Sequence, residues 1–91
     1  MQVREVYRTK NSIHYVYKRT PPSNFNDLTL NELLILHKQE RNNKVKDRYY
    51  WIIYDKRTDK WQCDCRQFSI HCDCPHVRKA LYVFKKSIKG N

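Results

Sequence analysis

The sequence predicts a small α+β domain in which a β-hairpin followed by an α-helix occurs twice. Two stretches rich in β-branched and aromatic residues, each broken by turn-forming residues, indicate the hairpins, and residues with helical periodicity follow each of them. The chain has 91 residues, and domains this small are often helped by a metal, disulfides or a partner because their core is modest. We expect one domain over residues 1–91, with an N-terminal hairpin and helix (1–48) and a C-terminal hairpin and helix (49–89).

The first hairpin is expected within residues 2–19. β-Branched and aromatic residues gather in two strands, separated by the polar stretch TKNS as a turn. Pro21 and Pro22 end the second strand, because proline lacks the N–H that a strand donates. The residues that indicate the strands are Val3, Val6 and Tyr7 in the first and Ile13, Tyr15, Val16 and Tyr17 in the second.

The first helix is predicted to begin just after Thr29. Thr29 and Glu32 have the spacing of a capping box, in which each side chain accepts a hydrogen bond from the backbone N–H of the other residue. We expect the helix to run to about Arg41, followed by a polar connection inside the same domain. Helical spacing places on one face of this helix the residues Leu30, Leu33, Leu34 and His37.

The second hairpin has the strongest strand signal of the chain, YYWIIY at residues 49–54. This stretch is aromatic and β-branched, and it is apolar on both faces, which is typical of a central strand. DKRTDK then turns the chain. WQC at residues 61–63 begins a return strand that ends at the first cysteine.

A C-terminal amphipathic helix is predicted from Pro75 onward. Its apolar positions keep the i, i+3, i+4, i+7 spacing of a buried stripe, which consists of Val77, Ala80, Leu81, Phe84 and Ile88. The other face of the same helix is basic and carries Arg78, Lys79, Tyr82, Lys85, Lys86 and Lys89.

Six residues able to bind a metal lie between Cys63 and His76. Cys63 and Cys65 are two positions apart, so on an extended chain both sulfurs point to the same side. Cys74 precedes a proline, and Pro75 suits the first position of a helix, which places Cys74 at the N-cap and His76 in the first turn. These two cysteine-bearing segments predict a closed tetrahedral Cys₃His site, typical of one structural Zn²⁺ and formed by Cys63, Cys65, Cys74 and His76.

Other uses of the cysteines compete with this set. A Cys₄ site would use Cys72 in place of His76, whereas we expect His71 and Cys72 to lie in a loop. A disulfide within a Cys-x-Cys pair would be strained, and nothing indicates a secreted protein. A catalytic cysteine would leave the other three sulfurs unexplained. Because the Cys₃His site has no open coordination position, we expect no enzyme activity.

The spacing of the ligands resembles the SWIM zinc finger family, whose signature is CxC, a variable gap and then CxH. CDCRQF is similar to the opening of the signature, with Phe68 three positions after the second cysteine, and CPHVRKAL is similar to its close. The proline between the last two ligands and the lack of a glycine before Cys74 depart from the family pattern. Over residues 49–88 the resemblance implies a zinc-bound ββα unit, found in transposase-related and chromatin-associated proteins and in partners of recombinases, with roles in DNA binding and protein–protein contact.

The chain carries 19 Lys and Arg against nine Asp and Glu, a formal charge of +10 that attracts polyanions strongly. Nucleic acid, with DNA favoured, is therefore the predicted partner. A solvated basic surface, or a basic patch that meets an acidic protein, would explain the same composition. Phosphate contacts are expected from the turn of the second hairpin and from the last helix, through Lys56, Arg57, Lys60, Arg78, Lys79, Tyr82, Lys85, Lys86 and Lys89.

An adaptor that joins a recombinase or transposase to DNA or to another subunit is the alternative function, and the family resemblance is its main support. No membrane segment is expected, because the longest apolar run, residues 33–36, is far shorter than the ~18 residues of a spanning helix. Nothing in the sequence resembles a signal peptide. We therefore expect an intracellular protein, cytoplasmic or associated with the nucleoid or nucleus.

Overall fold

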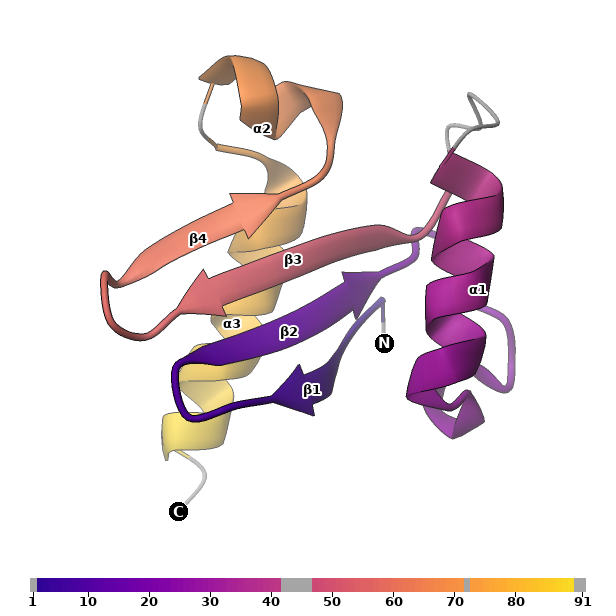
Figure 1. The fold of residues 1–91 in the computed structure, drawn as a ribbon, viewed down its shortest axis with the longest axis horizontal. Coiled ribbons are helices and arrows are strands. Elements are labelled where there is room, and N and C mark those ends of the chain that lie inside the picture. Colours follow the sequence, from indigo (N-terminus) through magenta and orange to yellow (C-terminus); the bar gives the residue numbers. More distant parts are fainter. Residues whose placement is uncertain (1, 42–46, 72, 90–91) are drawn as a thin grey trace.

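The computed structural model describes residues 2–41, 47–71 and 73–89, and it has the α+β class that the sequence predicts (Figure 1). A short 3₁₀ helix, Phe25–Asp27, lies between the first hairpin and the first α-helix. The strands and α-helices are β1 (Val3–Arg8), β2 (Ser12–Tyr17), α1 (Leu30–Arg41), β3 (Tyr50–Asp55), β4 (Lys60–Cys63), α2 (Arg66–His71) and α3 (Pro75–Lys89).

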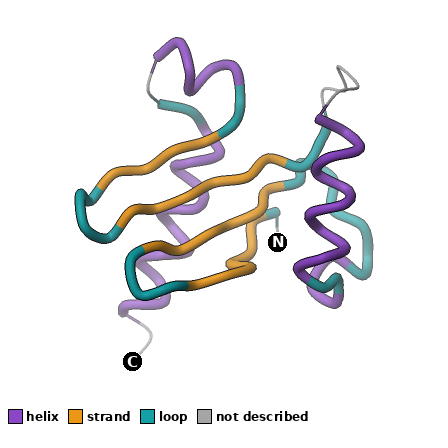
Figure 2. Tube along the Cα trace, viewed as in Figure 1, coloured by secondary structure: helices purple, strands orange, loops and turns teal. Residues whose placement is uncertain are grey.

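The four strands form one antiparallel sheet in the order β1-β2-β3-β4, so the two hairpins are joined through β2 and β3 (Figure 2). In this register Tyr17 lies opposite Tyr50, and Cys63 at the end of β4 lies opposite Ile52. Strand pairing therefore places the first cysteine beside the central strand β3, at the same end of the sheet as the two tyrosines.

One face of the sheet is covered by α3. Side chains alternate between the faces of a strand, and those of β2 and β3 that point toward α3 are buried: Ile13 is 1% exposed and Ile52 is 0% exposed. Ala80 of α3 is also 0% exposed, and its small side chain lets the helix lie close to the sheet. The buried members of this core are Val3, Ile13, Tyr15, Tyr17, Ile52, Tyr54, Cys65, Cys74, Val77 and Ala80.

The apolar stripe of α3 largely agrees with its predicted spacing. Val77 and Ala80 are buried, and Phe84 packs half-buried against the same core. Val83, which the spacing does not include, packs there as well, whereas the side chain of Ile88 is outside the described part of the chain. Neither α3 nor any other helix within the described ranges is long and apolar enough to cross a membrane.

A second core lies under α1, at one end of the other face of the sheet. Thr29 and Glu32 form the predicted capping box, with Glu32 N–H donating to Thr29 Oγ1 (3.2 Å) and Thr29 N–H donating to Glu32 Oε1 (3.0 Å). Leu33 is 0% exposed but Leu34 is 43% exposed. The face that helical spacing predicts is therefore only partly buried, because α1 rests on the end of the sheet and buries a narrow stripe. The buried members of this core are Val16, Phe25, Leu28, Leu33 and Tyr49.

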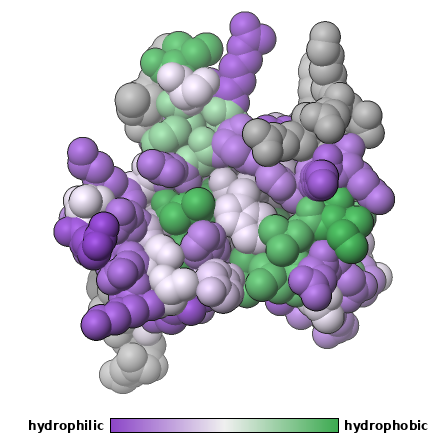
Figure 3. Space-filling view, in the orientation of Figure 1, coloured by the Kyte–Doolittle hydropathy of each residue, from purple (hydrophilic) through white to green (hydrophobic). Residues whose placement is uncertain are grey.

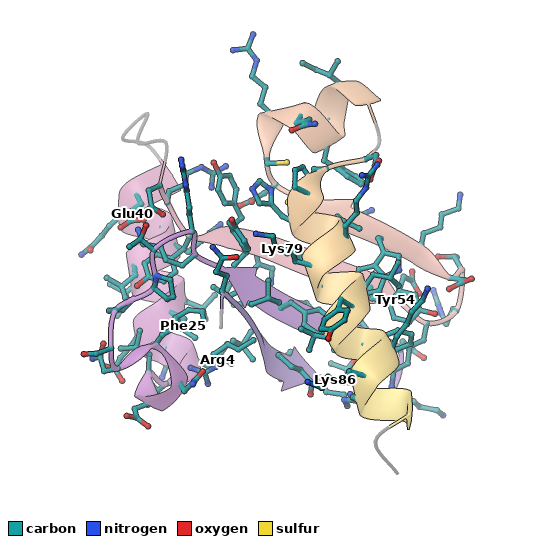
Figure 4. The ribbon with its side chains drawn as sticks, turned by 180° about the vertical axis from the view of Figure 1, so that it is seen from behind. Arg4, Phe25, Glu40, Tyr54, Lys79 and Lys86 are labelled. Atoms are coloured by element: carbon teal, nitrogen blue, oxygen red, sulfur yellow. The ribbon has the colours of Figure 1, made fainter. Side chains whose placement is uncertain are left out.

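The rest of this second face is not covered by a helix among the described residues, as the views from the two sides show (Figures 1 and 4). Trp51 and Ile53 on it are only half-buried, although β3 is a central strand. Figure 3 looks onto this open face and shows pale and hydrophobic side chains in its middle, bordered by hydrophilic ones. β3 is thus apolar on both faces, as its sequence indicates, but only one of these faces is closed by α3.

Candidate metal centre

Four of the six potential metal ligands come together at the start of α3. The Sγ atoms of Cys63, Cys65 and Cys74 and a ring nitrogen of His76 all lie within 4.8 Å of one another. Cys63 Sγ and His76 Nδ1 are 3.8 Å apart. Tetrahedral coordination with bonds of about 2.0–2.3 Å needs ligand atoms about 3.5–3.8 Å apart, so the group can hold one ion with small adjustments. These are the four residues that the spacing in the sequence predicts as ligands.

The second hairpin supplies two of the sulfurs. Cys63 is the last residue of β4, and Cys65 precedes the first residue of α2. Cys65 Sγ accepts a hydrogen bond from Phe68 N–H (3.3 Å), and Cys65 O accepts one from Ser69 N–H (3.3 Å). The Cys-x-Cys pair therefore joins the end of β4 to the beginning of α2, and Cys65 is the N-cap of α2.

The helix α2 corrects the sequence prediction of a loop that contains His71. Residues 66–71 are helical, and His71 is the last residue of α2. Ser, Thr, Asp and Asn are the usual N-cap residues, and here a cysteine takes that place, so the ordinary capping pattern does not reveal the helix. The signal that could have revealed it is the spacing of Cys65 and Phe68, which repeats the spacing of Cys74 and Val77 at the other helix start.

The start of α3 supplies the remaining two ligands. Cys74 is the N-cap and Pro75 the first helical residue, as predicted. Cys74 Sγ accepts a hydrogen bond from Val77 N–H (3.5 Å), and Cys74 O accepts one from Arg78 N–H (3.3 Å). A thiolate at this position would be stabilised by the free N–H groups and the positive end of the helix dipole.

The ring of His76 is held between two tyrosines of the central strands. Its centroid lies 4.3 Å from that of Tyr50, with the rings nearly parallel at 16°, and 4.5 Å from that of Tyr17. The two tyrosines face each other across the β2–β3 ladder. This contact restrains the rotation of the imidazole and keeps Nδ1 toward Cys63 Sγ. Sequence reasoning treats both tyrosines only as strand residues, since their partner across the sheet is not visible in the sequence.

Asp64, between the first two cysteines, ties the site to the opposite face of the sheet. Asp64 Oδ1 accepts a hydrogen bond from Trp51 N–H (3.1 Å), and Asp64 O accepts one from Arg48 Nη2 (2.9 Å). Its other carboxylate oxygen is hydrogen-bonded to Nε2 of His37 on α1. Burial by itself would raise the pKa of Asp64, but the bond to His37 and the charge of Arg48 lower that pKa below its usual value. Asp64 is therefore a structural contact of the site that sequence reasoning missed.

Burial governs the protonation of the ligands in the protein without an ion. It raises the pKa of the Cys63 thiol and that of Cys74, although the N–H of Val77 acts against the shift at Cys74. Burial also lowers the pKa of His76, with partial compensation from Asp64. The imidazole is thus neutral and ready to coordinate, whereas the thiols must lose protons when a cation binds.

The structure describes all four residues of the Cys₃His set, but not every residue of the competing Cys₄ set. Cys72, which the Cys₄ alternative requires, lies outside the described residues. Cys63, Cys65 and Cys74 are all free thiols, so none of the three cysteines that the structure describes forms a disulfide.

The residues predicted to contact nucleic acid fall into two groups. Arg57 and Lys60 line a hollow next to Ile53, on the open face of the sheet. Arg78, Lys79 and Tyr82 instead line an apolar pocket on the α3 side, next to Gln2 and Val3. Lys85 and Lys86 are exposed further along α3, Lys56 is exposed in the β3–β4 turn, and the side chain of Lys89 is outside the described part.

No family model, no curated protein and no solved structure matches this chain.

Proposed function

We propose that Cys63, Cys65, Cys74 and His76 bind one structural Zn²⁺ that stabilises a basic nucleic-acid-binding module. The donor set carries the metal proposal, because three thiolates and one imidazole in tetrahedral reach suit Zn²⁺ better than a hard cation. Protein side chains would fill all four positions, so the ion would hold β4 and α3 together and would not activate a substrate.

A SWIM-like zinc finger remains our proposal for the C-terminal unit. Its support is the position of the ligands, with Cys-x-Cys at the end of a hairpin and Cys-x-His at the start of the helix that packs on that hairpin. The helix α2 occupies the variable gap between the two pairs.

The exposed face of α3 supports nucleic-acid binding. Lys85 and Lys86 (the latter labelled in Figure 4) are exposed there. Neither forms an ion pair among the described residues, and Lys86 Nζ lies 6.0 Å from the centroid of the Tyr82 ring. Arg78 is engaged by Asp73 (2.7 Å), and Lys79 donates to Gln2 Oε1 (2.7 Å). The two unpaired lysines are therefore the α3 cations most available to phosphates, on a chain with a formal charge of +10.

Charge reversal on α3 tests this proposal. Duplex DNA binding by the zinc-loaded protein should weaken steeply with salt, and Lys85→Glu/Lys86→Glu should reduce the slope of log K against log salt by about 2. The matched control is Lys38→Glu/Arg66→Glu, which makes the same charge change at two exposed cations of α1 and α2. Absence of binding at low salt would contradict the function, and equal losses in both double variants would show that only net charge matters.

A protein adaptor is the second candidate function, and one observation favours it. Leu34 and Ile35 are neighbours on α1 and are 43% and 57% exposed. Adjacent exposed aliphatic side chains are typical of a protein contact. Sedimentation of the wild type and of Leu34→Lys/Ile35→Lys tests for self-association through this face: an assembly that the double variant abolishes supports it, and a wild type that stays monomeric at high concentration removes a second copy as the partner.

A further inference from the structure

The open face of the sheet carries a row of aromatic rings from four elements. Tyr7 of β1 packs edge-on against His14 of β2, with ring centroids 5.3 Å apart. His14 in turn contacts Trp51 of β3 at 6.2 Å, and Trp51 contacts His37 of α1 at 5.7 Å. Tyr7 is 47% exposed, and the next two rings are half-buried. The row therefore presents aromatic surface to solvent across the middle of the sheet.

Hydrogen bonds hold this row in a fixed arrangement. Trp51 Nε1–H donates to His14 Nδ1 (3.0 Å), and His14 Nε2 lies 3.1 Å from Ser12 Oγ. Since Nδ1 accepts a bond from the indole, a neutral His14 carries its proton on Nε2 and donates it to the serine. Burial lowers the pKa of His14, which favours this neutral form. The indole is thus oriented before any ligand arrives, which reduces the entropy lost on binding.

Two adjoining hollows form a trough along the same face. The first, of about 370 Å³, lies between α1 and the sheet and is lined by Leu34, His37 and Trp51 among others. The second, of about 280 Å³, lies at the β3–β4 turn. Ile53 and Gln62 line both hollows, so the hollows lie next to each other on the sheet. The trough consequently runs beside the aromatic row from α1 to the turn.

The end of the trough at the β3–β4 turn is positively charged. Arg57 and Lys60 line it, and neither side chain forms an ion pair within the described ranges. Asp55 also lines this end, but its Oδ1 accepts a hydrogen bond from Arg57 N–H (2.9 Å) and it lies opposite Lys60 in the ladder. At the other end of the trough, the Asp64 carboxylate is hydrogen-bonded to His37 Nε2 and accepts a hydrogen bond from the backbone N–H of Trp51. The two cations at the turn are therefore available to an anionic ligand.

We propose that the open face binds single-stranded nucleic acid, with bases stacked on Tyr7 and Trp51 and phosphates directed to Arg57 and Lys60. This inference rests on the proposed nucleic-acid function and adds a surface on the opposite side of the sheet from α3. Exposed aromatic rings beside a cationic groove suit splayed bases, because every base has a π-face to stack. In a duplex the bases are already stacked on one another, so the rings would find no free base face. An acidic protein would satisfy the cations but not the aromatic row.

The two tryptophans of the chain allow a direct test by fluorescence. Trp61 lies on the α3 side, packed against Tyr54 with ring centroids 4.7 Å apart, and Trp51 lies on the open face. In the zinc-loaded Trp61→Phe variant, Trp51 is the only tryptophan. Titration with a short oligothymidylate should quench its emission, because a base stacks on the indole. The Trp51→Phe variant keeps Trp61 and should bind with little quenching.

A variant of the aromatic row and a control at another exposed side chain complete the test. Tyr7→Ala should weaken binding of oligothymidylate roughly 5-fold to 150-fold, the loss of one base–aromatic stack. Ile70→Ala removes an apolar side chain that is 62% exposed on α2, outside both proposed surfaces, and it should leave this affinity unchanged. Zinc content and circular dichroism identify any variant that fails to fold, and oligouridylate provides the RNA arm of the same titration.

The outcomes separate this inference from the function on which it rests. Quenching of Trp51 together with loss of affinity in Tyr7→Ala supports single-strand binding on the open face. Binding that leaves Trp51 emission unchanged and responds only to Lys85→Glu/Lys86→Glu overturns the open-face site while the nucleic-acid function stands. If the protein binds no single strand and no duplex at low salt, both the open-face site and the nucleic-acid function are overturned. If an acidic polypeptide such as polyglutamate binds with equal affinity, the surface recognises charge alone and the proposed stacking of bases is overturned.

Discussion

The two faces of the sheet are built from the same strands but differ in what closes them. Ile13 and Ile52 point toward α3 and are almost completely buried, whereas their neighbours His14 and Ile53 point the other way and stay partly exposed. The α3 face also carries the four potential metal ligands, and the other face carries the aromatic row. Strand alternation thus divides one short sheet into a side for stability and a side available for contact.

A metal held by the four potential ligands would act on the α3 side of the sheet. α3 is a single helix that must be held on the sheet by a small core, and its N-terminus carries two of the ligands. An ion that joins Cys63 and Cys65 to the start of α3 would fasten the cover of this face. No helix among the described residues covers the open face, and hydrogen bonds between its side chains keep them in place.

Loss of a ligand on the α3 face should have the largest effect. We expect Cys74→Ser to abolish stoichiometric zinc binding and to lower the free energy of unfolding by several kcal/mol, because metal binding and folding are coupled in sites of this kind. Elemental analysis and urea unfolding measure the two quantities. Cys72→Ser is the control, which we expect to keep zinc and fold. Loss of zinc in both variants, together with zinc retention in His76→Ala, would indicate the Cys₄ set.

Truncating a core residue on the other face should lower the free energy of unfolding by less and should leave zinc binding intact. Leu33→Ala, at a residue that is 0% exposed, should lower the free energy of unfolding by about 2–5 kcal/mol with zinc content unchanged. Leu34→Ala, one position away and 43% exposed, should change it by less than about 0.5 kcal/mol. Loss of zinc in Leu33→Ala would show that the two faces are coupled more tightly than their separate cores suggest.

Removing a tyrosine that packs against His76 should lower zinc affinity without abolishing zinc binding. Tyr50→Leu removes the ring that lies parallel to the imidazole at 4.3 Å, and we expect zinc affinity to fall by about 10-fold to 100-fold, the scale for residues that orient a ligand. Competition with a chelating indicator measures the change, with Tyr82→Leu on the outside of α3 as control. Equal zinc affinity in both variants would show that the Tyr50 ring packs against His76 without orienting it for the metal.

The smallest effect is expected at Tyr15, whose hydroxyl is buried with no hydrogen-bond partner among the described residues. Tyr15→Phe should leave the free energy of unfolding unchanged or raise it by up to about 1 kcal/mol.

Burial raises the pKa of Tyr15 to about 12. The folded state therefore holds the phenol proton more tightly than the unfolded state, and this contribution is complete below pH 10 and lost as the pH rises through about 12. In alkaline urea unfolding the wild type should lose stability relative to Tyr15→Phe, and parallel curves would contradict the assignment.

Local patterns in the sequence were sufficient where neighbours along the chain determine the structure. The capping box of α1 and the N-cap role of Cys74 depend on residues a few positions apart, and both are present as predicted. The same reasoning failed at α2, because Cys65 caps the helix in place of the usual oxygen-bearing residue. Helical spacing also defines a face of α1 but not how much of that face the sheet covers, as the different exposure of Leu33 and Leu34 shows.

By itself the sequence determined the α+β class, the hairpin and helix segments and the four residues that gather as potential metal ligands, because these depend on periodicity, capping and short spacings. Only the tertiary structure decided that Tyr17 and Tyr50 hold the ring of His76, that Asp64 reaches α1, and that one face of the sheet stays open. These features join residues far apart in the chain. Their positions depend on strand order, register and the site where each helix packs, and no local pattern encodes those three quantities.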